Sequence, residues 1–330
     1  MAADEAQSPL AVLTDTQTSL GTGPSRAPDA TGFRHVFRRG VSYNLLLAIQ
    51  NDDNAPAAIR VTDALAARGA IPSVLRTIEL MTPALAPSST MLLYPEAALG
   101  MDFYTGQEGI IDSMIQNVLG TDRGWPVKSL GGEPAPTIIA EAEACGADLI
   151  VMGIHHHGAL DRAFGGNTAT RVMSNASIPL LGVRPEMSGL PRRIMVATDF
   201  GDASVEAAHL AANLADPGGL VFLVHATFPY PVVEEGDEGA ALVIRKGIEH
   251  AFLHLTADIS EGKSIRVETL TRHGDPAAQL LAAAETIAPD MIAIASQRHH
   301  LITRLMLGSV TGKVVREGRW PMLVAPPRVQ

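Results

Sequence analysis

The chain contains one unit written twice, and this repeat limits what it can fold into. Residues 148–185 recur as residues 290–326, and residues 45–50 recur as residues 194–199. The pairs that fix the spacing of the first match at 142 positions are Asp148 with Asp290, Gly166 with Gly308, and Pro179 with Pro321. The second match has a spacing of 149, so the first copy is seven residues longer (149 minus 142). A two-copy repeat of this length predicts two domains rather than a solenoid.

Apolar runs of strand length alternate with segments of helical period in both copies. In the first copy we expect strands at residues 45–49, 72–78, 126–130, 149–152 and 179–183, and helices at 55–68, 106–119 and 135–144. In the second we expect strands at 194–197, 220–225, 265–271, 291–295 and 321–325, and helices at 204–214, 241–258, 276–287 and from 309. Asn54 and Asp275 are the expected caps of the helices that follow them.

Unbroken apolar strands that alternate with helices predict a parallel sheet covered on both faces. The fold class is therefore α/β, with two flavodoxin-like or Rossmann-like domains in tandem. Right-handed crossovers favour five strands in the order 3-2-1-4-5 in each domain. The two fifth strands would otherwise leave open edges, so we expect them to meet and pack the domains as a pseudo-twofold pair.

The expected boundaries follow from the repeat and from local composition. Residues 38–186 form the first domain and residues 191–327 the second. Residues 1–37 are rich in small and polar residues without helical or strand period, which predicts a flexible tail. Residues 81–100 contain four prolines and no clear period, so they are expected to be an insertion.

Charge and cysteine content exclude several classes of function. The formal net charge is −10, whereas binding to nucleic acid or to an anionic membrane needs a basic face. No apolar run approaches the roughly 20 residues of a membrane span, and Asp4 and Glu5 argue against a secretory signal. Cys145 is the single cysteine, so no internal disulfide can form, and we expect it to be a small apolar residue on a helix. A cytoplasmic protein is expected, without nucleic-acid or membrane partners.

Each domain should offer a ligand site where its first and fourth strands lie side by side. The chain leaves these two strands in opposite directions, and the crevice beyond their carboxyl ends is the usual ligand site of such sheets. The residues there are Gln50 with Gly153 in the first copy, and Asp199 with Ala295 in the second. The glycine-containing loop that follows ends on a helix N-terminus, whose free N–H groups can hold a phosphate. The alternative is that residues 166–167 and 308–309 serve only as helix caps.

At these residues the chain resembles the universal stress protein family in its tandem form, over about residues 40–327. Nucleotide-binding members carry Gly, two residues, Gly, nine residues, Gly and then Ser or Thr after the fourth strand, and an aspartate after the first. In the family this aspartate meets the adenosine end of ATP, and the loop holds the phosphates. Both copies keep the spacing but depart from the pattern. The first copy has Gln50, Gly153, His156, Gly166 and Asn167 at these positions, and the second has Asp199, Ala295, Arg298, Gly308 and Ser309.

The resemblance implies ATP or another adenine nucleotide as ligand, with Mg²⁺ as a companion ion. A side chain at a loop position that needs a left-handed conformation costs about 1–2 kcal/mol, which weakens such a site without abolishing it. Arg298 could compensate through charge-assisted bonds to phosphate. The residues expected to contact the nucleotide are Thr198, Asp199, Ala226, Gly274, Ala295, Arg298, Gly308, Ser309 and Val310 in the second copy, and Gln50, Gly153, His156, Gly166 and Asn167 in the first.

Neighbouring histidines occur in both loops, at residues 155–157 and 299–300. Adjacent side chains point in different directions, and no carboxylate or cysteine stands at ligand spacing, so we interpret them as solvated loop residues and expect no metal site. No catalytic set of Ser, His and Asp, no paired catalytic carboxylates and no Walker-type loop is present. The acidic residues 234–238 are interpreted as a solvated surface.

Three hypotheses about function follow. The first is a regulatory stress-response protein that acts by binding, with an unknown protein partner and with a homodimer left open. The second is a slow ATP hydrolase in which Asp199 positions water or Mg²⁺ and Arg298 neutralises charge. The third is a protein-interaction scaffold that binds no ligand.

Overall fold

The computed structural model describes residues 33–50, 52–78, 108–154, 168–228, 238–296 and 307–326. The first half contains β1 (Tyr43–Ile49), α1 (Ala55–Ala66), β2 (Ala70–Ile78), α4 (Glu108–Leu119), β3 (Val127–Gly131), α5 (Pro134–Ala144), β4 (Leu149–Gly153), α6 (Thr168–Asn175) and β5 (Leu180–Val183). The second half contains β6 (Arg193–Ala197), α7 (Asp202–Leu214), β7 (Leu220–Thr227), α8 (Glu238–Ser260), β8 (Arg266–His273), α9 (Pro276–Ile287), β9 (Met291–Ala295), α10 (Ser309–Glu317) and β10 (Met322–Ala325). The expected insertion at residues 81–100 and residues 234–237 of the acidic loop lie outside the described residues.

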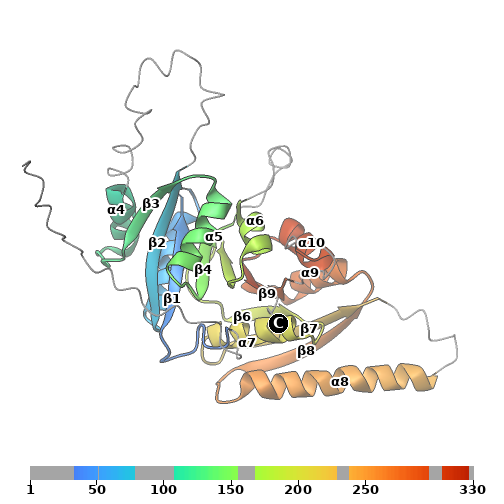
Figure 1. Cartoon of the computed structure of the whole chain (residues 1–330). Coiled ribbons are helices and arrows are strands. Elements are labelled where there is room, and N and C mark those ends of the chain that lie inside the picture. Colours follow the sequence, from blue (N-terminus) through green and yellow to red (C-terminus); the bar gives the residue numbers. More distant parts are fainter. Residues whose placement is uncertain are drawn as a thin grey trace, which may run out of the picture.

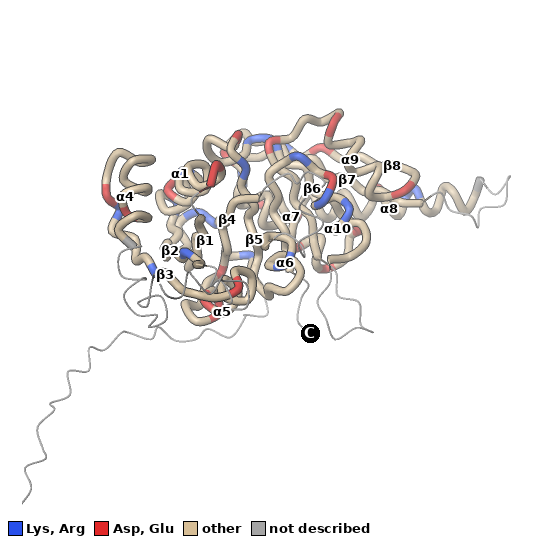
Figure 2. The backbone as a smooth tube through the Cα atoms, turned by 90° about the horizontal axis from the view of Figure 1, so that it is seen from above, with Lys and Arg blue, Asp and Glu red and all other residues tan. Residues whose placement is uncertain are grey.

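The ten strands form one sheet in the order β3-β2-β1-β4-β5-β10-β9-β6-β7-β8 (Figure 1). Each half therefore has the predicted order 3-2-1-4-5, and its strands are parallel. The halves meet where β5 pairs antiparallel with β10, with Leu181 opposite Leu323. The predicted meeting of the two fifth strands is confirmed. Figure 2 shows the two halves side by side, with acidic and basic residues mixed along both.

Two hydrophobic cores lie on opposite faces of this sheet, and each runs through both halves. Leu45 and Leu47 of β1 face a core that α1, α4, α7 and α8 cover. Leu46 and Ala48 face the other core, which α5, α6, α9 and α10 cover. The alternation along an apolar strand that is buried on both faces is what the continuous apolar runs indicated. No helix in these described stretches is long and apolar enough to cross a membrane.

The segment at residues 33–41, here called the arm, corrects the prediction of a flexible tail that extends to residue 37. Val36 and Phe37 are fully buried in the core under α7. Asn213 of α7 donates from Nδ2 to the backbone oxygens of Arg34 (2.9 Å) and Val36 (3.1 Å). Two apolar side chains in a stretch of mostly small and polar residues therefore fix the arm onto the second half of the protein. The arm nevertheless precedes the first half in the sequence. Residues 1–32 lie outside the described residues.

One of the two predicted helix caps is confirmed and the other is wrong. Asp275 accepts from the backbone N–H of Ala278 (2.9 Å) at the start of α9, as predicted. Asn54 makes no side-chain cap to α1. Asp52 Oδ1 accepts instead from the backbone N–H groups of Asn54 (2.9 Å) and Ala55 (3.1 Å). The turn before α1 thus brings the earlier carboxylate to the free N–H groups and leaves Asn54 buried beneath it.

Two arginines of the first half hold the second half in place. Arg184, directly after β5, is buried and donates to the backbone oxygens of Trp320 and Gly318, both at 3.3 Å. Arg68, after α1, donates to the backbone oxygen of Leu214 (2.9 Å) and pairs with Asp216. The halves are therefore joined by directed polar contacts as well as by the β5–β10 pairing.

Candidate functional site

The turn after β6 carries Asp199, the acidic residue of the predicted nucleotide site in the second half. Asp199 is exposed at the carboxyl end of this strand. Its Oδ1 accepts from the backbone N–H of Gly201 (3.0 Å) and from the hydroxyl of Ser204 (2.7 Å) in the first turn of α7. The carboxylate is thereby fixed in position between the end of β6 and the N-terminus of α7.

The same turn is fixed by contacts that sequence reasoning missed. Thr198 is buried, and its Oγ1 accepts from the backbone N–H of Phe200 (3.0 Å). His225 of β7 donates from Nδ1 to the backbone oxygen of Thr198 (2.8 Å), which places the proton of a neutral ring on Nδ1. Phe200 has φ +63°. Its ring packs against the rings of His225 and Phe252, with centroid distances of 4.8 Å and 4.9 Å. A left-handed conformation at a residue other than glycine costs about 1–2 kcal/mol, so the surrounding contacts must over-determine this turn.

The end of β9 lies beside this turn. Val196 of β6 is opposite Ala293 of β9, so Thr198 and Ala295, each two positions further on, meet at the same edge. Ala295 is buried, and its backbone oxygen accepts from the hydroxyl of Thr311 (2.7 Å). This bond ties the first turn of α10 to the strand that carries the predicted site.

The N-terminus of α10 is the part of the predicted phosphate cradle that lies within the described residues. Gly308 is the N-cap of the helix, and Ser309 is its first residue and exposed, as predicted. Val310 is half-buried. The first N–H groups of a helix have no partner within the helix and favour an anion. Lys313, one turn further on, is paired with Asp275 (3.1 Å).

Ala226 and Gly274 lie further along the edge, at the ends of β7 and β8. Gly274 has φ +136°, and a side chain there would bring its Cβ to 2.9 Å from Nε2 of Gln279. Gly132, its counterpart in the first half, has φ +150°. The turn itself therefore requires glycine at both positions, whether or not a ligand is present. Ala226 is half-buried in β7 opposite Arg272.

The first half has a different arrangement at the corresponding edge. Gln50 donates from Nε2 to the hydroxyl of Thr77 (3.3 Å) at the end of β2. A Cβ on Gly153 would lie 2.5 Å from the Cβ of Asn54, so the close approach of α1 accounts for this glycine. By the repeat, Ala203 stands at the position of Asn54, and Ala295 at that of Gly153. This paired change in size was a signal available in the sequence.

The rest of the predicted site lies outside the described residues. These positions are His156, Gly166, Asn167 and Arg298, together with the other loop histidines. Across the stretches that the structure does describe, no group of three or more His, Cys, Asp or Glu is placed to hold a metal ion. Cys145 follows the last residue of α5 and is half-buried, and burial raises the pKa of its thiol. A protonated thiol agrees with the packing role expected for it.

Comparisons with known proteins agree with the repeat. Residues 43–184 and 191–326 each match the universal stress protein family. A universal stress protein of Mycobacterium tuberculosis is 22% identical over 287 residues, which are 80% of this chain and 92% of that protein. A universal stress protein of Methanocaldococcus jannaschii is 27% identical over 139 residues, which are 41% of this chain and 82% of that protein.

Solved structures have the same fold. A universal stress protein from Archaeoglobus fulgidus aligns with a TM-score of 0.58 and 21% identity over 88% of this chain and 97% of that one. A Pseudomonas aeruginosa protein of unknown function aligns with a TM-score of 0.55 and 15% identity over 87% of this chain and 93% of that one. Because the family matches cover most of the sequence, in two consecutive segments, the chain belongs to the universal stress protein family and carries two of its domains in tandem.

Proposed function

We propose that the second half binds ATP or another adenine nucleotide, together with Mg²⁺, at the carboxyl edge between β6 and β9. The protein acts in this proposal as a cytoplasmic regulatory protein in the stress response, through binding rather than turnover. The observation that carries the proposal is the fixed carboxylate of Asp199, which lies next to the strand that leads to the N-terminus of α10.

Two physical arguments support this assignment. A carboxylate whose position is set by Gly201 and Ser204 can accept hydrogen bonds from a ribose with little ordering cost. The N-terminus of α10, held to β9 by Thr311, offers N–H groups to the phosphates. The first half lacks the acid, because Gln50 occupies its position, so the second half is the proposed binding half.

The first test is the nucleotide content of the purified protein, measured after denaturation by ion-exchange chromatography with mass detection. We expect adenine nucleotide near one equivalent per chain, or binding of added Mg-ATP in titration calorimetry. Asp199→Ala should weaken binding about 10-fold or more, because a hydrogen bond to a charged group is worth about 1.5–3 kcal/mol. Ser309→Ala should weaken it less, because the backbone N–H groups of the helix remain.

The matched control is Gln50→Ala in the first half, which should leave the affinity within about twofold. An empty protein that also fails to bind Mg-ATP would contradict the proposal and favour the scaffold. Steady release of ADP, lost in Asp199→Ala, would show turnover and favour the hydrolase.

A further inference from the structure

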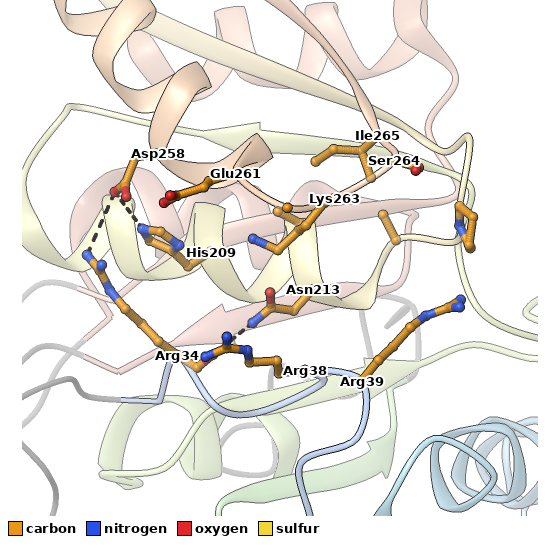
Figure 3. A pocket seen from close by; sticks show the side chains of 14 residues that line it. Arg34, Arg38, Arg39, His209, Asn213, Asp258, Glu261, Lys263, Ser264 and Ile265 are labelled. Carbon is orange, nitrogen blue, oxygen red and sulfur yellow. Dashed lines mark hydrogen bonds and ion pairs between the residues drawn. The ribbon is translucent and has the colours of Figure 1, made fainter.

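A cavity lies at the opposite edge of the sheet from Asp199, at the amino ends of β7 and β8. Its volume is about 550 Å³. The arm forms one wall, and α7 and the end of α8 form the other (Figure 3). The charged residues that line it are Arg34, Arg38, Arg39, Asp258, Glu261 and Lys263.

The arm holds its basic residues in place by backbone contacts. Asn213 binds the backbone oxygens of Arg34 and Val36, and the backbone N–H of Arg38 donates to the backbone oxygen of His35 (3.1 Å). Arg38 and Arg39 are both exposed, and Figure 3 shows them along the same wall as Arg34. Their backbone is thus fixed while their guanidinium groups remain accessible to a ligand.

The carboxylates of the pocket do not neutralise all of its cations. Asp258 accepts from Nε2 of His209 (2.7 Å) and lies 4.0 Å from the guanidinium of Arg34. Elsewhere in the described part of the chain, no carboxylate lies within ion-pair distance of the side chains of Arg38, Arg39 or Lys263. Four cations, Arg34, Arg38, Arg39 and Lys263, therefore line this cavity with two carboxylates, Asp258 and Glu261, in a chain whose net charge is −10.

Lys263 is a partly buried cation of this pocket. Its Nζ donates to the backbone oxygen of Ile259 (2.8 Å) at the end of α8. Burial, followed by the positive charge of Arg38, lowers its pKa, and the carboxylates of Asp258 and Glu261 oppose this shift without cancelling it. Burial also lowers the pKa of His209, so near neutral pH the ring is uncharged and serves as a donor to Asp258. An anion in the cavity would offset the repulsion among these cations.

We propose that this pocket binds a small polyanion of the pyrophosphate type, held by Arg38, Arg39 and Lys263. Guanidinium groups form paired hydrogen bonds to phosphate oxygens, and a cavity of about 550 Å³ is within the usual size range for a small-molecule ligand. The net charge of −10 disfavours a long nucleic acid, so the proposed ligand is small. The site is separate from the proposed nucleotide site, which lies beyond the other ends of the strands.

Titration calorimetry with inorganic pyrophosphate at low ionic strength tests the proposal. We expect saturable binding by the full chain, weakened about 100-fold in the double variant Arg38→Gln/Arg39→Gln, because each of the two charge-assisted contacts contributes about tenfold. Pyrophosphate should also slow the hydrogen exchange of the backbone amides of residues 33–41 and 261–265. Among the residues that the structure describes, neither substituted side chain has a hydrogen-bond or ion-pair partner, so the variant should keep the melting temperature of the parent.

The matched control is Arg245→Gln/Lys246→Gln. These adjacent cations are exposed on α8, about 18 Å along the helix from Asp258, and their substitution changes the net charge equally. We expect the control to bind within about twofold of the parent. Absence of saturable binding would overturn the proposal, and so would equal loss in both double variants or protection confined to α10.

Discussion

The two halves share one fold and differ at the edge where a nucleotide would lie. In the first half, Gln50 reaches across to Thr77 of the neighbouring strand. In the second half, Asp199 turns toward its own helix and binds Gly201 and Ser204. The same position is thus bonded across the sheet edge in one half and to the turn before a helix in the other.

Contacts that support the fold are, by contrast, repeated. An aspartate before the fourth strand accepts from the backbone of the first strand in both halves, and an acid at the start of one helix pairs with a cation on the next. These contacts join Asp148 to Asn44 and Asp290 to Arg193, and Glu133 to Arg171 and Asp275 to Lys313. A contact present in both halves therefore belongs to the fold, and one present in a single half marks where the halves have separate roles.

The largest expected effect concerns Arg184, a contact that only the first half makes. Pro326 stands at the equivalent position of the second half. Arg184→Ala removes two bonds to the carbonyls of Trp320 and Gly318 in a buried site, so it should lower the free energy of unfolding by about 3 kcal/mol. Urea denaturation measures this loss.

Arg192→Ala is the control, because Arg192 is an exposed arginine between the halves. It should change the free energy of unfolding by less than about 0.5 kcal/mol. Equal effects of the two substitutions would show that the bonds of Arg184 add no stability to the junction between the halves.

The next effect tests the close approach of Asn54 to Gly153 at the edge of the first half. Gly153→Ala places a Cβ 2.5 Å from that of Asn54 and should destabilise the first half by about 2 kcal/mol. Asn54→Gly/Gly153→Ala removes the Cβ that the new methyl group meets, so the second substitution should recover part of that loss. Thermal unfolding of the single and double variants measures the coupling free energy between positions 54 and 153. A double variant less stable than the sum of the single changes would contradict the steric explanation.

Exchanging the acid between the halves should have a smaller effect on stability. Asp199→Gln removes the acceptor for Gly201 and Ser204 and should cost about 1 kcal/mol, the usual net contribution of such hydrogen bonds. Gln50→Asp gives up one long hydrogen bond to Thr77 and should cost less than about 0.5 kcal/mol. Paired urea denaturation curves measure both. Equal costs would show that Asp199 has no structural role specific to its half.

The sequence predicted the sheet order and the meeting of β5 with β10 because both follow from the repeat and from the apolar runs. It could not predict the arm, because Val36 and Phe37 become core residues only through α7, which lies far along the chain. Asn54 was misjudged for a similar reason, since only the geometry of the turn decides which of two polar residues reaches the helix. The left-handed Phe200 depends on packing against β7 and α8 and leaves no local pattern.

At the edge, the sequence located Asp199 and the start of α10, because strand ends and helix caps have local signals. It attributed Gly153 and Gly274 to a ligand. The structure supplies steric reasons for both glycines, through Asn54 and Gln279. Resemblance to a motif cannot separate a glycine that a ligand requires from one that a neighbouring side chain requires.

The smallest expected effect compares the repeated ion pairs under acid. The pKa of Asp275 is lowered first by the N–H of Ala278 and then by Lys313, whereas that of Glu133 is lowered by Arg171. A depressed folded-state pKa stabilises the protein above the ordinary carboxylate range, and this contribution is lost as the pH falls through the folded-state value. Asp275→Asn and Glu133→Gln should each lower the melting temperature by roughly 1 °C at pH 7, and the difference should vanish in acid.

The partner cations separate the two cases. Arg171→Gln should abolish the acid-dependent contribution of Glu133, because the ion pair is its main cause. Lys313→Gln should leave most of the acid-dependent contribution of Asp275, because the hydrogen bond from the N–H of Ala278 remains. Melting temperatures of each single and double variant between about pH 3 and pH 7 measure both. Loss of the whole contribution in Lys313→Gln would show that Asp275 acts as an ion-pair partner, as Glu133 does, and that the cap adds no charge dependence of its own.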